Sequence, residues 1–124
     1  MPRILIVDDE PSLRHVVGEH LRRAGHDVAT VSNGLEALDE MREAAFDLVI
    51  TDIIMPQMEG IETIRELRKQ TPALKIIAMS GGGRFDDGDY YLRMAHLFGS
   101  DAVLAKPFSR EQLLEAVTRV LKKE

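Results

Sequence analysis

The feature that most constrains this chain is a regular alternation between short β-branched runs and longer segments with helical periodicity. The β-branched runs cover residues 4–7, 28–31, 48–51, 75–79 and 102–105. In residues 11–25, 34–45, 60–70 and 109–122, apolar residues recur at every third or fourth position. Parallel strands need a crossover segment between them, and near-continuous apolar strands indicate a sheet covered on both faces. The alternation therefore predicts an α/β fold with a parallel sheet and helices on both sides.

Local signals place the ends of the predicted helices. Pro11 suits a first helical turn, and Gly25 is a stop signal. Ser109 and Gln112 have the spacing of a capping box. Residues 80–100 contain a glycine triplet and an acidic stretch, so we expect a loop there and then a short helix over residues 90–98. The side chains expected on the apolar helix faces are Leu13, Val16, Val17, Leu21, Leu35, Leu38, Met41, Ile61, Ile64, Leu67, Leu113, Leu114, Val117, Val120 and Leu121.

Composition excludes several classes of protein. The chain has 124 residues and no change in composition that would mark a boundary, so we expect one domain over residues 1–124. It has no cysteine, which excludes a disulfide scaffold and a thiol nucleophile. A formal net charge of −5 argues against direct nucleic acid binding, and no apolar run approaches the ~20 residues of a membrane span. Because the N-terminus lacks a signal-peptide pattern, we expect a cytoplasmic protein without membrane insertion.

Charged and polar residues are concentrated directly after the predicted strands. Asp8 and Asp9 follow the first strand, Asp52 the third, Ser80 the fourth and Lys106 the fifth. Right-handed crossovers bring the carboxyl ends of parallel strands to one edge of the sheet, where α/β proteins bind ligands. Carboxylates brought together need a compensating cation, and their oxygens suit Mg²⁺. The sequence therefore predicts a magnesium site flanked by a hydroxyl and an ammonium group.

Each of these residues alone has an ordinary explanation. An Asp after a strand is more often a turn residue or a helix cap than a ligand, and paired acids also favour a helix N-terminus. A Lys-Pro pair after a strand is usually a solvated loop. The joint placement of three acids, one hydroxyl and one lysine after four different strands is what favours a functional site.

These residues stand in motifs that resemble the receiver domain of response regulators, the phosphate-accepting module of bacterial two-component signalling. The ordered segments that carry the resemblance are Ile6-Val7-Asp8-Asp9-Glu10, residues 47–56 with Gly60, Met79-Ser80 and Lys106-Pro107-Phe108. The resemblance implies a flavodoxin-like, doubly wound five-stranded parallel sheet of order 2-1-3-4-5 with five helices. It also implies a cis Lys106–Pro107 peptide bond, since X–Pro is where cis is least costly.

The resemblance implies a role for each site residue. Asp52 is then the phosphoryl acceptor, Ser80 donates to one phosphoryl oxygen, and Lys106 pairs with another. The implied magnesium ligands are Asp9, Asp52, Asp8 (partly through water) and the backbone carbonyl of Ile54. A carboxylate is a competent nucleophile, and Mg²⁺ would cancel the repulsion of the incoming phosphoryl group by Asp8 and Asp9. Lys106 and Ser80 would respond to the arrival of the phosphate.

As a receiver, the chain is expected to take phosphate from a histidine kinase or a histidine phosphotransfer protein and to switch a surface that binds a downstream protein target. It would catalyse only its own phosphorylation and dephosphorylation, so we do not expect an enzyme in the wider sense. Two alternatives stay open: a stand-alone module, or the receiver portion of a longer DNA-binding regulator or hybrid histidine kinase. The Met before the first strand and the last helix without a linker favour the first. The intact acidic and basic residues argue against a receiver that no longer takes phosphate.

Two departures from the family pattern shape the expected switch. Val103 stands three positions before the lysine, where the family usually has a Tyr or Phe that swings inward on activation. The segment between Ser80 and Lys106 is also a few residues longer than usual. We therefore expect phosphate to rearrange residues 81–99 while Val103 keeps its rotamer.

Motifs of rival sites do not occur in the sequence. A dinucleotide site requires G-x-G-x-x-G after the first strand, whereas Asp8-Asp9-Glu10-Pro11 would repel a pyrophosphate. A haloacid-dehalogenase phosphatase needs a second acid two residues after its nucleophile, but position 54 is Ile. Residues 86–89 lack the closing Glu of a calcium loop, and the histidines have no ligand spacing.

Overall fold

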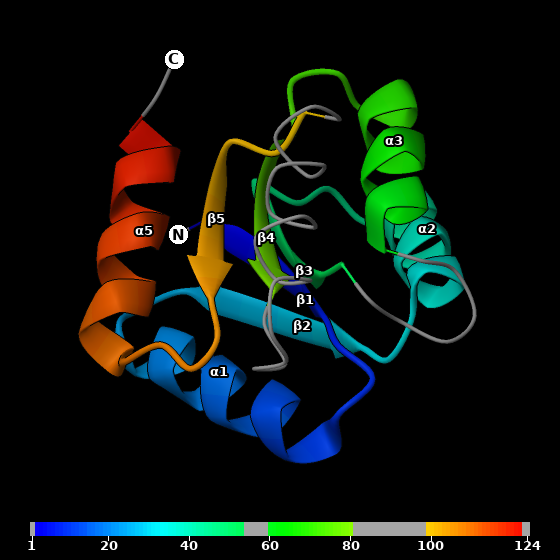
Figure 1. Ribbon diagram of the computed structural model, residues 1–124. Helices are drawn as coiled ribbons and strands as arrows, with labels where there is room; N and C mark the ends of the chain where they lie inside the picture. The colour runs from blue at the N-terminus through cyan, green and yellow to red at the C-terminus, as the bar shows by residue number, and fades with distance from the viewer. Residues whose placement is uncertain (1, 54–59, 81–98, 123–124) are drawn as a thin grey trace.

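The strands form one parallel sheet in the order β2-β1-β3-β4-β5 (Figure 1). The structure is a computed structural model that describes residues 2–53, 60–80 and 99–122, except for the side chains of Ile61 and Ser80. The strands are β1 (Arg3–Val7), β2 (Asp27–Val31), β3 (Leu48–Asp52), β4 (Lys75–Ser80) and β5 (Ala102–Ala105). The helices in the described part are α1 (Pro11–Arg23), α2 (Gly34–Glu43), α3 (Gly60–Gln70) and α5 (Arg110–Lys122). The predicted sheet order is confirmed, and the helix expected over residues 90–98 lies outside the described residues.

The sheet separates two apolar cores, because successive side chains of a strand point to opposite faces. On β1, Ile4 and Ile6 face the core shared with α1 and α5, whereas Leu5 and Val7 face the core shared with α2 and α3. Figure 1 shows the same division, with α5 on one side of the sheet and α2 and α3 on the other. Because helices cover both faces of the sheet, a binding site can form at the edge where the carboxyl ends of the strands lie.

Two residues expected on apolar helix faces are exposed. Val16 is 46% exposed and Leu35 is 49% exposed. On α1 the buried stripe runs through Val17 and Leu21, and a helical step of one residue turns Val16 away from it. On α2 the buried residues are Ala37 and Leu38, and Leu35 lies in the first turn beside that stripe. The expectation was therefore wrong at Val16 and Leu35, and α2 also ends at Glu43 rather than at residue 45.

Side-chain caps fix the helices that border the carboxyl edge of the sheet. The capping box before α5 is confirmed: Gln112 N donates to Ser109 Oγ at 3.0 Å, and Ser109 N donates to Gln112 Oε1 at 2.8 Å. Asn33 caps α2 through a hydrogen bond from Glu36 N at 2.9 Å. Before α1, the Glu10 side chain makes no capping hydrogen bond. Other contacts therefore hold the connection between β1 and α1.

Arg68, near the end of α3, joins the beginnings of β4 and β5. Its guanidinium donates to the carbonyl oxygens of Leu74 and Gly99 and contacts Asp101 Oδ2 at 3.2 Å. Asp101 Oδ2 also accepts a hydrogen bond from Ile76 N at 2.8 Å. Gly99 has φ of 104°, a conformation that favours glycine. The start of β5 is therefore tied to α3 and β4.

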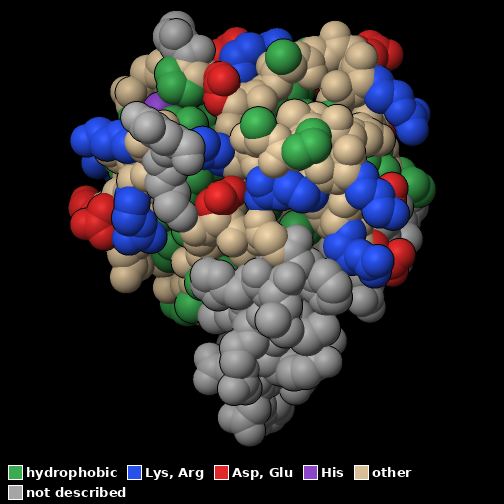
Figure 2. All heavy atoms as spheres, turned by 90° about the horizontal axis from the view of Figure 1, so that it is seen from above, with side chains coloured by type: hydrophobic (Ala, Val, Ile, Leu, Met, Phe, Trp, Pro, Cys, Tyr) green, Lys and Arg blue, Asp and Glu red, His purple; other side chains and the backbone are tan. Residues whose placement is uncertain are grey.

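Basic residues gather at the end of the molecule where β4 and β5 begin. Figure 2 looks onto this end and shows Lys and Arg side chains over much of it. Arg68 and Lys69 lie in the last turn of α3, and Arg119 and Lys122 in that of α5, where cations complement the helix dipoles. Among the described residues, no helix is both long and apolar enough to cross a membrane.

Candidate functional site

Three carboxylates meet at the carboxyl edge of the sheet. Asp8 follows β1 directly, Asp52 is the last residue of β3, and the two strands are neighbours with Val7 opposite Thr51. One carboxylate oxygen each from Asp8, Asp9 and Asp52 lies within 4.8 Å of the others. Asp8 and Asp52 are buried, with exposed fractions of 1% and 8%, whereas Asp9 is exposed. The structure thus brings together the three acids that the sequence placed after separate strands.

Lys106 supplies the positive charge of this group. Its Nζ lies 2.7 Å from Asp52 Oδ2 and 3.5 Å from Asp8 Oδ2. Lys106 follows β5, so the contact joins the far strand of the sheet to the central strand β3. The Lys106–Pro107 peptide bond is cis, as expected.

Burial and charge shift the pKa of two groups in the site. Burial raises the pKa of the Asp8 carboxyl, and the nearby charges of Asp52 and Asp9 add to this, against the Glu10 N–H and the Lys106 ammonium. For Lys106, burial favours the neutral amine, but the hydrogen bond and charge of Asp52 outweigh it and raise the pKa. The site thus holds Lys106 charged and carries an excess of negative charge, three acids against one base.

The donor set fits a hard divalent cation. All three side chains offer carboxylate oxygens, the ligands that Mg²⁺ prefers. Asp8 Oδ1 accepts a hydrogen bond from Glu10 N at 2.8 Å, whereas the buried Asp8 Oδ2 has no hydrogen-bond partner among the described residues. A buried carboxylate oxygen without a hydrogen bond is costly, and a cation would satisfy it.

Gly60 allows the start of α3 to lie against the backbone at the end of β3. Its N–H donates to Ile53 O at 3.0 Å. A Cβ at position 60 would lie 2.1 Å from the Asp52 carbonyl oxygen and 2.1 Å from Ile53 Cα. Only glycine allows this approach, so α3 begins in direct contact with the backbone of Asp52.

Sequence reasoning missed one contact at this edge. Arg14, in the first turns of α1, donates from Nη1 to the Asp8 carbonyl oxygen at 2.7 Å. The available signal was a basic residue six positions after Asp8 in a helix that begins without a side-chain cap.

Two predicted site groups cannot be placed. Ile54, whose carbonyl was expected on the metal, lies outside the described residues. The backbone of Ser80 ends β4 at the same edge as the acids, but its side chain is not described.

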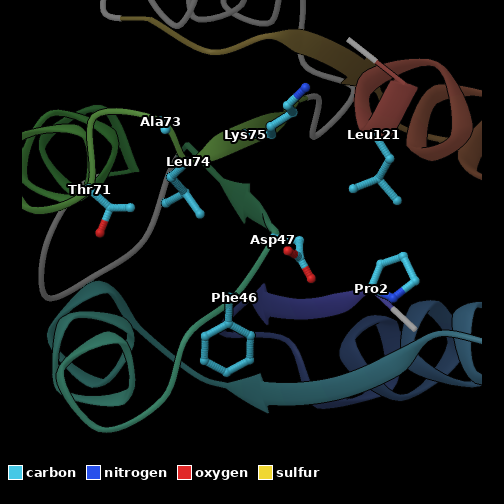
Figure 3. Close-up of a pocket in the computed structure, with 8 residues that line it drawn as sticks. All are labelled: Pro2, Phe46, Asp47, Thr71, Ala73, Leu74, Lys75 and Leu121. Atoms are coloured by element: carbon cyan, nitrogen blue, oxygen red, sulfur yellow. The ribbon is translucent and has the colours of Figure 1, made fainter. Parts of the chain in front are cut away.

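A separate hollow of about 640 Å³ lies at the opposite end of the sheet (Figure 3). Asp47 and Lys75 mark this end, since Asp47 precedes β3 and Lys75 begins β4. The hollow is bordered by apolar side chains, and Asp47 there accepts a hydrogen bond from Arg3 N at 2.8 Å. Size alone does not make it the functional site, because the clustered acids and the half-buried Lys106 ammonium lie at the other end. Its lining residues are Pro2, Phe46, Asp47, Thr71, Ala73, Leu74, Lys75 and Leu121.

Comparison with known proteins defines the class. The chain matches the family model of the response regulator receiver domain over residues 4–118. It is 36% identical over 121 residues to chemotaxis protein CheY of Thermotoga maritima, covering 97% of this chain and 98% of that protein. The chain belongs to the response regulator receiver family.

Other relatives show this domain within different proteins. A CpxR homolog from Haemophilus influenzae, a transcriptional regulatory protein, is 35% identical over 125 residues, covering 99% of this chain but 52% of the relative. The chain thus spans about half the length of that relative. The receiver domain of sensor histidine kinase PA1611 from Pseudomonas aeruginosa, solved with a magnesium ion coordinated in its active site cleft, has a TM-score of 0.85 and 28% identity, covering 98% of each chain.

Proposed function

We propose that Asp52 accepts a phosphoryl group from a histidine kinase or a histidine phosphotransfer protein, and that this switches a surface read by a downstream protein. The observation that carries the proposal is the 2.7 Å contact between Lys106 Nζ and Asp52 Oδ2 beside two further carboxylates. This arrangement places the nucleophilic Asp52 carboxylate beside the positively charged Lys106 ammonium group, and phosphoryl transfer requires both.

In the transfer step, a carboxylate oxygen of Asp52 attacks the phosphorus of a phosphohistidine. A P–O bond forms as the P–N bond breaks, and the electron pair of the P–N bond stays on the imidazole nitrogen, which takes up a proton. The Lys106 ammonium lies next to the attacking carboxylate of Asp52, where it would neutralise charge on the phosphoryl oxygens. Its raised pKa keeps it protonated for this purpose. Ser80, at the end of β4, is proposed to donate to another phosphoryl oxygen.

Asp8, Asp9, Asp52 and the Ile54 carbonyl are proposed to hold Mg²⁺. When bound, the cation supplies charge compensation between the acids and the incoming phosphoryl group. The magnesium ion in the related receiver domain of PA1611 supports this assignment. The chain's own part is to hold Asp8 and Asp52 buried and close together, so that their oxygens are ready as ligands.

The output of the whole protein is a separate proposal. Coverage of nearly all of CheY supports a stand-alone protein-binding module, whereas coverage of half of the CpxR homolog supports a receiver joined to a DNA-binding part. We favour the stand-alone module in the cytoplasm, catalysing only its own phosphorylation and dephosphorylation. Its open reading frame distinguishes the two alternatives.

Trapping of the phosphorylated residue tests the function. Incubation with acetyl phosphate and Mg²⁺, then borohydride reduction and mass spectrometry, should label the peptide that contains Asp52. Asp52→Asn should abolish the label, whereas Asp39→Asn, at a surface aspartate paired with Arg42, should retain it. Labelling of Asp52→Asn at the wild-type level would refute the assignment.

A further inference from the structure

The connection between β1 and α1 presents two of the three acids, yet few contacts hold it. Strand pairing of β1 ends at Val7 on both of its sides. Beyond it, Asp8 N still donates to Val31 O at 3.2 Å, and Glu10 N donates to Asp8 Oδ1. Glu10 caps α1 without a side-chain hydrogen bond, and Pro11 has no N–H to donate.

Arg14 provides a further contact to this connection. Its side chain reaches back along α1, and Nη1 donates to the Asp8 carbonyl oxygen at 2.7 Å, a short charge-assisted hydrogen bond. Arg14 is half-buried, so its guanidinium is partly shielded from water. The main chain of Asp8 is therefore held from both sides, by β2 at its N–H and by Arg14 at its C=O.

We propose that Arg14 is a positioning residue for the divalent cation: by bonding the Asp8 carbonyl oxygen, it fixes the turn that presents the Asp8 and Asp9 carboxylates to Asp52. This inference rests on the proposed function, because it assigns a role within the same site. Arg14 itself does not contact the carboxylates in the described structure; it acts through the backbone between them. Residues that orient ligands in this way typically change metal affinity by about 10–100-fold when removed.

The charge of Arg14 makes the proposal testable, because loss of the charge and loss of the positioning contact should change the affinity for Mg²⁺ in opposite directions. A cation beside the site repels Mg²⁺, so loss of its charge alone would tighten magnesium binding. Loss of the positioning contact would instead weaken it. Arg14→Met removes both charge and donors, whereas Arg14→Lys retains the charge but not the planar guanidinium.

Magnesium titrations followed by the amide NMR signals of Asp9 and Asp52 measure the effect. We expect Arg14→Met to weaken Mg²⁺ binding about tenfold, the lower end of the usual range, and Arg14→Lys to weaken it as well. Arg23→Met removes a charge from an exposed position of the same helix and should leave the affinity unchanged. In acetyl phosphate reactions, Arg14→Met should need more Mg²⁺ for half-maximal rate but reach the wild-type rate at saturation.

The outcomes separate the inference from the function on which it rests. Folded Arg14→Met that binds Mg²⁺ as tightly as wild type, or more tightly, would overturn the inference. If Arg14→Met does not fold, unchanged Mg²⁺ affinity of Arg14→Lys would overturn it equally. A wild-type protein that binds neither Mg²⁺ nor beryllofluoride would instead refute the proposed function.

Discussion

At the scale of single residues, Asp8 shows the conflict between function and stability within the site. Its carboxylate is 1% exposed, one of its oxygens lacks a hydrogen bond among the described residues, and two other acids lie nearby. The raised pKa of Asp8 means that the folded chain favours the protonated carboxyl more than the unfolded chain does. Ionisation of the Asp8 carboxyl therefore lowers the free energy of unfolding.

We expect Asp8→Asn to raise the free energy of unfolding at neutral pH, because the amide carries no charge. Urea unfolding of both proteins without and with Mg²⁺ measures this. The advantage of Asp8→Asn should be full above the raised pKa of Asp8. It should shrink as the pH falls through that pKa and vanish below the ordinary value of 3.8, where the wild-type carboxyl is protonated in both states. Added Mg²⁺ should stabilise wild type more than the variant. Equal stability at neutral pH without the metal would contradict the prediction.

Gly60 shows how one residue type sets the position of Asp52. A Cβ there would overlap the backbone at Asp52 and Ile53, and neither can move without displacing β3. We expect Gly60→Ala to lower the free energy of unfolding by about 2 kcal/mol or more, and to slow labelling of Asp52 even where the protein is folded. Thermal unfolding and acetyl phosphate labelling measure the two effects.

Gly18→Ala is the matched control. Gly18 lies inside α1, and its added Cβ would meet only the far end of the Arg22 side chain at 3.3 Å and Thr30 Cγ2 at 3.8 Å. Alanine is a better helix former, so this variant should be as stable as wild type or more so, with normal labelling. The same loss in both variants would show that the close approach at Gly60 has no special role.

At the scale of elements, hydrogen bonds to α3 and β4 hold the start of β5 in place. The turn before it is tied to α3 and β4 through Arg68, Gly99 and Asp101, and β5 then pairs with β4. Val103, in the middle of β5, is half-buried and lies opposite Ala78 of β4. Its side chain is short and has restricted rotation about χ1, so we do not expect a large side-chain movement at this position.

We therefore expect beryllofluoride with Mg²⁺ to change the amide NMR signals of residues 81–99 strongly, while the methyl signals of Val103 change little. This expectation rests on the sequence, which has glycines at 81–83, a residue type that changes backbone conformation at little cost. Asp52→Asn serves as the control and should show no change of these NMR signals on addition of beryllofluoride. A main change at Val103 and along β5, with residues 81–99 unaffected, would show that the switch runs through the strand instead.

The elements also show what sequence could and could not predict. The sheet and the meeting of Asp8, Asp52 and Lys106 follow from topology, because parallel strands must place their carboxyl ends on one edge. Val16 and Leu35 were misplaced because periodicity locates an apolar face only to within a residue. The hydrogen bond of Arg14 was not predictable, because a long side chain near the start of a helix is within reach of many acceptors. Only the folded turn brings the Asp8 carbonyl oxygen next to its guanidinium.

At the scale of the whole molecule, the two ends of the sheet differ in how their charged side chains are grouped. The carboxyl edge of the strands holds the three clustered acids, whereas the end seen in Figure 2 carries the basic last turns of α3 and α5. The acidic end attracts divalent cations and repels anionic phosphate donors until the cation is bound. Metal binding is thus expected to precede efficient transfer, and salt should modulate both steps.

The bond between Lys106 and Asp52 spans 54 positions of the chain. During synthesis, the acids of the first and third strands emerge well before the lysine that follows the fifth. A nascent or truncated chain that ends before Lys106 holds the carboxylates without their ammonium partner and lacks the charge that the transfer step needs. We therefore expect full competence to accept phosphate only in chains that extend to Lys106, so that a phosphorylated molecule would also be one synthesised to this point.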